Sequence, residues 1–321
     1  MEKEIRATGA TSEETVVQGD STQASAEQKT EPAPQQRRVL TGMPKMNTSP
    51  LHGLWALTNR DLVKWYKNPI QLVISLIQPV VWLGLFGKAL NFGSFITGSG
   101  TNVPPSVVNS IMENTFGTTS YFSFLACGML AFIILFTSAF SGMSVVFDRR
   151  FGFMNKALST PVGRGAIVTS KVLQSAIRSL IQAGIVLGIA VILGMDITHM
   201  TALGIAGSFT ILFLMSFALS SLFVMLALRS SEWQTQMAVI NLLNLPLLFA
   251  SNSIFPTKLM PTWLQDIVKV NPVSYANDAV RNLLIGSPSA FGVATDFAVL
   301  IGFAVVLGAM GIILSWRLLS K

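Results

Sequence analysis

The sequence predicts an all-α integral membrane protein with six transmembrane helices. The prediction rests on the amino-acid composition and on the length of the apolar runs. Of the 321 residues, 51% are hydrophobic and only 12% are charged, whereas soluble globular domains carry roughly 25% charged residues. The apolar residues gather into six runs of about 20 residues, the length that a helix needs to cross the hydrocarbon layer. The predicted spans are residues 70–90, 121–147, 172–195, 202–228, 237–254 and 295–316.

Two polar segments lack the hydrophobic periodicity of a packed element. Residues 1–50 are rich in Glu, Gln, Ser, Thr and Pro, and such a segment buries too little apolar surface to offset its ordering entropy. We therefore predict a disordered cytoplasmic tail, without the apolar core of a signal peptide. Residues 91–120, rich in Gly, Ser, Thr and Asn, are predicted to form a flexible external loop.

An amphipathic helix is predicted over residues 51–68, directly before the first span. Its apolar and aromatic side chains fall on one face of a 3.6-residue period and its cations fall opposite. This pattern is typical of a helix that lies in the membrane interface, and a surface helix of a soluble domain is the alternative. The apolar face holds Leu51, Leu54, Trp55, Leu62, Trp65 and Tyr66, and the cationic face holds Arg60, Lys64 and Lys67.

The distribution of Lys and Arg near the span ends predicts the orientation in the membrane. Cytoplasmic segments carry an excess of these residues, and here one side has twelve and the other has four. We therefore expect a multi-pass protein of the plasma membrane with both termini in the cytoplasm. The twelve are Arg60, Lys64, Lys67, Arg149, Arg150, Lys156, Arg164, Lys171, Arg178, Arg229, Arg317 and Lys321, and the four are Lys88, Lys258, Lys269 and Arg281.

The basic loop between the second and third spans, residues 148–171, also has an apolar pattern. Four apolar residues recur at helical spacing and would form one stripe, and a Thr-Pro pair ends the helix. Two interpretations are open: a solvated basic loop on anionic lipid, or a docking helix whose stripe fits a groove on a cytoplasmic partner. The stripe consists of Phe147, Phe151, Met154 and Leu158, and the helix ends at Thr160 and Pro161.

The segment before the last span, residues 255–289, is predicted to form an external pair of helices. Asn271–Pro272 is typical of the N-cap and first residue of the second helix, which Gly286 closes. Asp278 and Arg281 are spaced i, i+3 and can pair. Two interpretations are possible: a helical hairpin that rests on the outer membrane interface, or a re-entrant lid over the exit of a pathway.

The sequence shows no catalytic or metal-binding pattern. It has no P-loop, no Gly-x-Ser-x-Gly and no Cys/His metal spacing, and His52 and His199 are its only histidines. No carboxylate lies deep in a predicted span. Arg178 is the exception among the charged residues, because it lies one or two turns inside the third span. Its side chain could snorkel to the cytoplasmic interface. We expect no cofactor in this chain, no nucleic-acid partner, and an outside energy source for any transport.

These elements together resemble the permease subunits of type-2 ABC exporters, close to the daunorubicin-resistance and nodulation-factor export membrane proteins. The resemblance covers residues 51–321. The basic loop is similar to the family pattern D-R-E-x-G…P-x-x-R…K, with Phe151 at the acidic position, and the external segment is similar to the family signature before the last span. The matched residues are Asp148, Arg149, Arg150, Gly152, Pro161, Arg164 and Lys171, and then Phe255, Pro256, Pro261, Trp263, Leu264, Asn271, Pro272, Tyr275, Asp278 and Arg281.

The resemblance implies an ATP-driven exporter of an amphipathic, lipid-like or glycan-linked substrate. Such a permease pairs with a second copy or a paralogue in the lipid membrane, and it binds a separate ABC subunit that holds ATP and Mg²⁺. A passive channel, a membrane scaffold or a secondary transporter is the alternative. ATPase docking is assigned to Asp148, Arg149, Arg150, Phe151, Gly152, Met154, Pro161 and Arg164, and the lid interpretation assigns an external gate to Phe255, Pro256, Asn271, Pro272, Tyr275, Asp278 and Arg281.

Overall fold

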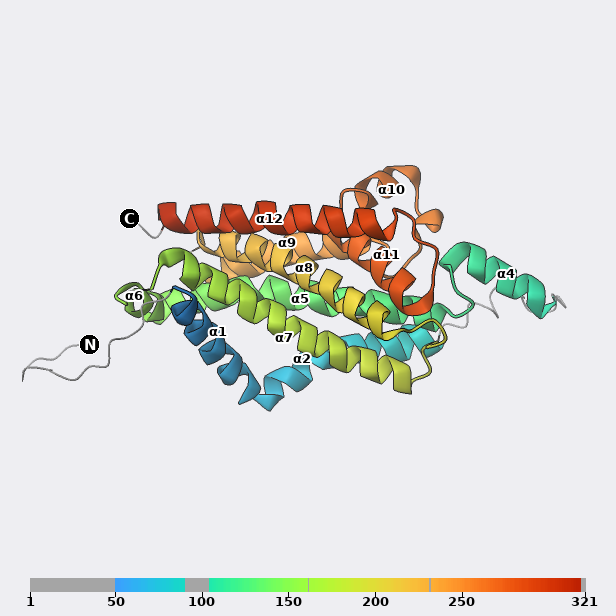
Figure 1. The fold of residues 1–321 in the computed structure, drawn as a ribbon, viewed down its shortest axis with the longest axis horizontal. Helices are drawn as coiled ribbons and strands as arrows, with labels where there is room; N and C mark the ends of the chain where they lie inside the picture. Colours follow the sequence, from blue (N-terminus) through green and yellow to red (C-terminus); the bar gives the residue numbers. More distant parts are fainter. Residues whose placement is uncertain (1–49, 90–103, 161, 231, 319–321) are drawn as a thin grey trace, which may run out of the picture. The chain divides into compact units, whose positions relative to one another are not determined.

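The computed structural model describes residues 50–89, 104–160, 162–230 and 232–318. These residues form a bundle of helices without a strand (Figure 1), so the predicted all-α class is confirmed for the described part of the chain. The tail predicted over residues 1–50 lies outside that part, apart from Pro50, which begins the first helix.

The helices follow the order of the predicted elements. They are α1 Pro50–Tyr66, α2 Pro69–Trp82, which continues as a π-helix over Leu83–Lys88, α4 Pro105–Phe116, α5 Tyr121–Arg150, α6 Phe153–Leu158, α7 Arg164–Ile192, α8 Ala202–Ala227, α9 Trp233–Phe249, α10 Thr262–Val268, α11 Pro272–Ile285 and α12 Val293–Leu318, with one 3₁₀ turn at Thr257–Leu259.

Five helical segments are long and apolar enough to cross a membrane. They contain α2, α5, α7, α8 and α12, which match the first, second, third, fourth and sixth predicted spans. The fifth predicted span corresponds to α9, which has 17 residues. At 1.5 Å per residue α9 is about 25 Å long, shorter than the ~30 Å hydrocarbon layer. The sixth crossing therefore stays a prediction.

Helix α5 is the centre of the bundle and packs against α7, α8, α9 and α11. Its approach to α8 requires Gly142, because a Cβ atom there would lie 2.5 Å from the carbonyl oxygen of Phe223. Buried serines also join the helices: the hydroxyls of Ser179 on α7 and Ser216 on α8 are 2.8 Å apart. Small residues and interhelical hydrogen bonds of this kind stabilise helix packing in membranes.

The flexible loop predicted over residues 91–120 is wrong in its described part, which contains α4. Met112 and Phe116 of α4 are buried in the same core cluster as the first turns of α5. The i, i+4 recurrence of Val108, Met112 and Phe116 is the helical signal. The Gly, Ser, Thr and Asn content of the whole segment concealed it.

The two ends of the bundle hold different elements (Figure 1). The end where α5 passes into α6 also holds the last turns of α12, where Trp316 lies beside Gly165 of α7. The opposite end holds α11, whose C-terminal Gly286 contacts His199 of the α7–α8 connection. We name them the α6 end and the α11 end, and the predicted topology places the α6 end in the cytoplasm.

Candidate functional site

The predicted docking loop forms an elbow between α5 and α6. Helix α5 continues to Arg150, and Gly152 then has a φ of +70°, a left-handed conformation that glycine adopts without steric cost. The elbow separates α5 from α6. The prediction of a single helix over residues 148–158, with one continuous apolar stripe from Phe147 to Leu158, is therefore wrong.

The apolar residues of the elbow have opposite environments. Met154 is only 4% exposed and packs in a core cluster with Val145 and Ile167. Phe151 is 78% exposed, and its ring stacks on that of Phe147 with centroids 6.2 Å apart. Met154 cannot enter a partner's groove without leaving this core, so the exposed part of the predicted stripe is the Phe147–Phe151 pair.

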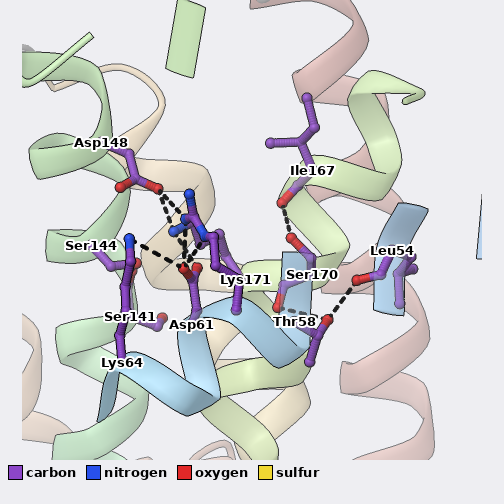
Figure 2. A network of polar contacts seen from close by, with 11 residues as sticks. Leu54, Thr58, Asp61, Lys64, Ser141, Ser144, Asp148, Ile167, Ser170 and Lys171 are labelled. Carbon is purple, nitrogen blue, oxygen red and sulfur yellow. Dashed lines mark hydrogen bonds and ion pairs between the residues drawn. The ribbon is translucent and has the colours of Figure 1, made fainter. Parts of the chain in front are cut away.

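An ion-pair network connects the elbow to α1 and α7 (Figure 2). Lys171 of α7 places its Nζ atom 2.6 Å from Oδ2 of Asp61 and also pairs with Asp148 of α5. Figure 2 shows the two carboxylates directed at Lys171 from either side. Arg60 of α1 joins the network, since its Nη2 atom lies 2.5 Å from Asp61 and 3.7 Å from Asp148.

The charges of the network stabilise one another. Burial by itself would raise the pKa of Asp61, but the Lys171 ammonium and then the Arg60 guanidinium favour the carboxylate and hold that pKa below its usual value of 3.8. The Lys171 side chain is 6% exposed, so it is not part of a solvated basic loop. The network instead fixes α1, α5 and α7 to one another.

The predicted helix over residues 51–68 is confirmed as α1, and the face that contacts the bundle includes Asp61, which the prediction assigned to neither face. Thr58, Asp61 and Trp65 are spaced by three and four residues and lie on one face. Thr58 and Trp65 are buried, and Thr58 Oγ1 donates to the carbonyl oxygen of Leu54. Arg60, predicted on a free cationic face, lies 3.5 Å above the Phe153 ring. The helix is thus attached to α7 by a polar face.

Asp61 is the residue of the ion-pair network that sequence reasoning missed. The signal was available: it is an acidic residue three positions before Lys64 on a helix otherwise rich in cations. Because the prediction counted only cations on this helix, Asp61 had no assigned role. Its true partner, Lys171, is 110 residues away along the chain.

The remaining loop residues have separate roles. Arg149 donates to the carbonyl oxygens of Leu228 at 2.9 Å and Ser230 at 3.3 Å, so it caps the C-terminal end of α8, where a cation is favourable. Arg150 is exposed and Arg164 begins α7. The predicted residue Pro161 lies outside the described part of the chain.

The two helices predicted within residues 255–289 are confirmed as α10 and α11, and their external location stays a prediction. Asn271 caps α11 by accepting a hydrogen bond from the Val273 amide at 3.0 Å, and Gly286 ends it with a φ of +67°. The two helices differ in exposure. Trp263 and Ile267 of α10 are exposed, whereas nearly all of α11 is buried against α5, α8 and α12. Helix α11 therefore does not rest on the membrane surface.

The predicted Asp278–Arg281 ion pair is wrong, because each side chain has other partners. Asp278 accepts hydrogen bonds from the amides of Ala290 at 2.9 Å and Phe291 at 3.0 Å. Arg281 donates to the carbonyl oxygen of Ser253 at 3.0 Å. The i, i+3 spacing allowed a contact, but burial directs Asp278 to the connection before α12 and Arg281 to the loop that follows α9.

The other residues of the predicted external gate lie around these two side chains. Phe255 is exposed and Pro256 is buried. Tyr275 donates from its hydroxyl to the carbonyl oxygen of Lys269 at 2.5 Å. A small open pocket of about 180 Å³ is lined in part by Pro256, Asp278 and Arg281. The structure thus brings three of the predicted gate residues together around one pocket at the α11 end.

A larger open pocket of about 590 Å³ lies between α2, α5, α7 and α9. Its volume is in the range of sites that bind small molecules. Apolar side chains such as Ile74 and Phe136 form much of its wall, together with amide and hydroxyl groups, and Arg178 is the one charged residue among the described residues that line it. The pocket therefore combines apolar contact area with a single cation.

Hydrogen bonds hold the helices around this pocket. Gln182 of α7 donates from Nε2 to the Ser75 hydroxyl of α2 at 2.5 Å, and Thr137 of α5 donates from Oγ1 to Gln182 Oε1 at 2.7 Å. Ser75 and Thr137 both line the pocket. The three helices are thus joined by side-chain hydrogen bonds at the pocket wall.

Comparison with known proteins identifies the family. A model of the ABC-2 type transporter family matches residues 52–285. The chain is 32% identical over 231 residues to the transport permease ycf38 of Cyanophora paradoxa, which covers 72% of this chain and 73% of the relative. It is 24% identical to the daunorubicin resistance ABC transporter permease protein DrrB1 of Streptomyces coeruleorubidus, over 77% of this chain and 80% of the relative. It is 27% identical to nodulation protein J of Rhizobium leguminosarum bv. viciae, over 76% of this chain and 87% of the relative. The chain therefore belongs to the ABC-2 type transporter family and is a membrane transport permease of the ABC exporter type.

Proposed function

We propose that this permease moves an amphipathic substrate out of the cytoplasm, driven by a separate ABC subunit that binds ATP and Mg²⁺ and docks at the α5–α6 elbow. The observation that carries the proposal is the elbow itself. It exposes the Phe147–Phe151 pair, while the residues beside the pair are fixed by the Lys171 network and by the Arg149 cap of α8.

An exposed aromatic pair on a fixed support is suited to bind a protein partner. Aromatic residues dominate the energetics of protein interfaces, and ordering entropy is small where the support is already rigid. The elbow also leads directly into α5, the helix with which most of the bundle is in contact. If a partner moved the elbow, α5 would therefore transmit the movement to the 590 Å³ pocket and to the α11 end.

The pocket supports an amphipathic substrate. It opens beside α2 and α9, whose described side chains are largely exposed, and we propose that a second permease copy or a paralogue covers this side in the membrane. The relative from Streptomyces coeruleorubidus is named for daunorubicin resistance. From that name we take for this chain only the proposed class of substrate, an amphipathic small molecule. The orientation follows the Lys and Arg excess, with the α6 end in the cytoplasm.

The docking proposal is tested with Phe151→Glu in cells that also express the ABC subunit. Burial of a Phe side chain is worth roughly 1.5–3 kcal/mol, and ~1.4 kcal/mol is a factor of ten in affinity. We expect at least tenfold less ABC subunit to co-purify with Phe151→Glu. Lys156→Ala, which changes an exposed residue of α6, is the matched control and should retain the subunit.

Two results would overturn the proposal. Full retention of the ABC subunit by Phe151→Glu would exclude docking through the aromatic pair. If loss of charge at Lys156 weakened the contact of the elbow with anionic lipid while Phe151→Glu kept its partner, the elbow would be a lipid-binding basic loop. A passive channel, a scaffold or a secondary transporter predicts that no ABC subunit co-purifies with the unmodified permease and that ATP does not affect transport.

A further inference from the structure

Arg178 lies at an unusual position for a charged residue. It is six residues inside the third predicted span, roughly 9 Å along the helix axis from the start of that span, and it lines the 590 Å³ pocket. Charged residues inside membrane spans are costly, and they normally face a partner charge or an aqueous cavity. A partner for Arg178 is therefore expected.

The described residues provide no such partner. None of the ion pairs among them includes Arg178, and its Nε atom is buried without a hydrogen-bond acceptor. Asp61 and Asp148, the two carboxylates that contact α7 through Lys171, are already paired with that lysine. A guanidinium that is partly removed from water needs an acidic or strongly polar partner.

The aromatic contact of Arg178 does not replace an acid. Its guanidinium carbon lies 5.5 Å from the centre of the Trp65 ring, near the outer limit of about 6 Å for a cation–π interaction. Such a contact positions the side chain between α7 and α1 and leaves the buried Nε–H of the guanidinium without an acceptor. The side chain is thus held beside the pocket with donors available.

We propose that the pocket between α2, α5, α7 and α9 binds an amphipathic molecule whose acidic group, a phosphate or a carboxylate, pairs with Arg178. The apolar wall around Ile74 and Phe136 would contact the apolar part of the molecule, and Gln71 and Gln78 supply further polar groups at the wall. This inference rests on the proposed export function only for its role in transport, because binding itself requires no ATP.

The test measures binding to the full-length permease in nanodiscs of neutral phosphatidylcholine, without the ABC subunit. Trp233 lines the pocket, so a brominated alkyl chain that enters it quenches tryptophan fluorescence. The probes are bromododecyl phosphate, the neutral bromododecanol, and inorganic phosphate as a competitor. We expect the phosphate amphiphile to bind at least about tenfold more tightly than the alcohol, with the quenching lost in Trp233→Phe. Inorganic phosphate should compete weakly, because it lacks the apolar part.

Substitutions then assign the charge preference to one residue. Arg178→Gln should reduce the preference for the phosphate amphiphile to about onefold, and Arg178→Lys should retain part of it. Arg229→Gln removes the same charge from an exposed position just after α8 and should keep the full preference. If Arg178→Gln weakens both probes equally, Arg178 only braces α1 and the inference fails.

The inference also fails on the unmodified protein if the two amphiphiles bind equally, whether or not any variant folds. Equal competition by inorganic phosphate would assign the site to a free anion and would refute an amphipathic ligand. These results are independent of ATPase docking. If no ABC subunit co-purified while the charge preference persisted, the proposed function alone would fail.

Discussion

Replacement of Lys171 by Met tests whether the ion-pair network holds α1 to the bundle. Met keeps the length of the aliphatic side chain and removes the ammonium that Asp61 and Asp148 share. The two carboxylates would then keep Arg60 as their shared cation, with the exposed Lys64 beside Asp61. We expect α1 to separate from α7 more often than in the unmodified protein.

The magnitude follows from burial. Removal of one partner from a buried ion pair costs about 3–5 kcal/mol. The side chains of Asp61 and Asp148 are 10% and 17% exposed, and Arg60 still contacts both, so solvent and the remaining cation reduce this cost. We expect a loss of about 3 kcal/mol, which increases the open population of α1 by roughly 100-fold.

Hydrogen exchange of the α1 amides, measured by mass spectrometry on the protein in nanodiscs, reports this opening. Lys64→Met is the matched control, because Lys64 is 62% exposed and lies 3.9 Å from the same carboxylate. An exposed pair contributes at most about 1 kcal/mol. Equal exchange rates in Lys171→Met and Lys64→Met would refute the reasoning, and unchanged exchange in Lys171→Met would show that apolar contacts alone hold α1.

Three further outcomes are expected. Gly152→Ala should lower the free energy of unfolding by about 1 kcal/mol, because alanine is strained at positive φ. Gly188→Ala within α7, where a Cβ atom meets open space, should raise it by up to ~1 kcal/mol. Equal effects of the two variants in thermal unfolding would contradict this difference. Asp278→Asn should increase proteolysis between α11 and α12, because a neutral amide accepts weakly from the Ala290 and Phe291 amides; an unchanged cleavage pattern would count against it. The pKa of Asp61 is lower in the folded state, so the stability that its carboxylate contributes is present above about pH 4 and is lost as the pH falls further. Asp61→Asn should therefore lose less stability than the unmodified protein in that pH range. Parallel pH profiles of the two proteins would refute this role of Asp61.

The parts of the fold that the sequence predicted depend on local signals. Asn271, Pro272 and Gly286 set the ends of α11 within a few residues of themselves, through an amide hydrogen bond and a left-handed turn. The apolar runs likewise predicted all five membrane-length helices of the described residues, since hydrophobic length is a property of a single segment. Such features need no knowledge of distant residues.

The parts that the sequence did not predict depend on contacts between distant residues. Arg281 has its partner at Ser253, and Asp278 has its partners near Ala290, although the two side chains are neighbours on one helix. Lys171 was counted as a basic loop residue, because nothing near it in the chain indicates Asp61 as its partner. Helical spacing states which residues can meet but not which buried partner each one binds.

The burial of α11 has a consequence for the order in which the protein is synthesised and assembled. Helix α11 has 14 residues and carries the buried polar residues Asn277, Asp278 and Arg281, so by itself it is too short and too polar to be stable in lipid. One of the helices that cover it is α12, which follows α11 in the chain and is synthesised after it. The α11 end can therefore close only after α12 has been made, and a nascent chain that stops before α12 leaves the polar residues of α11 without this cover.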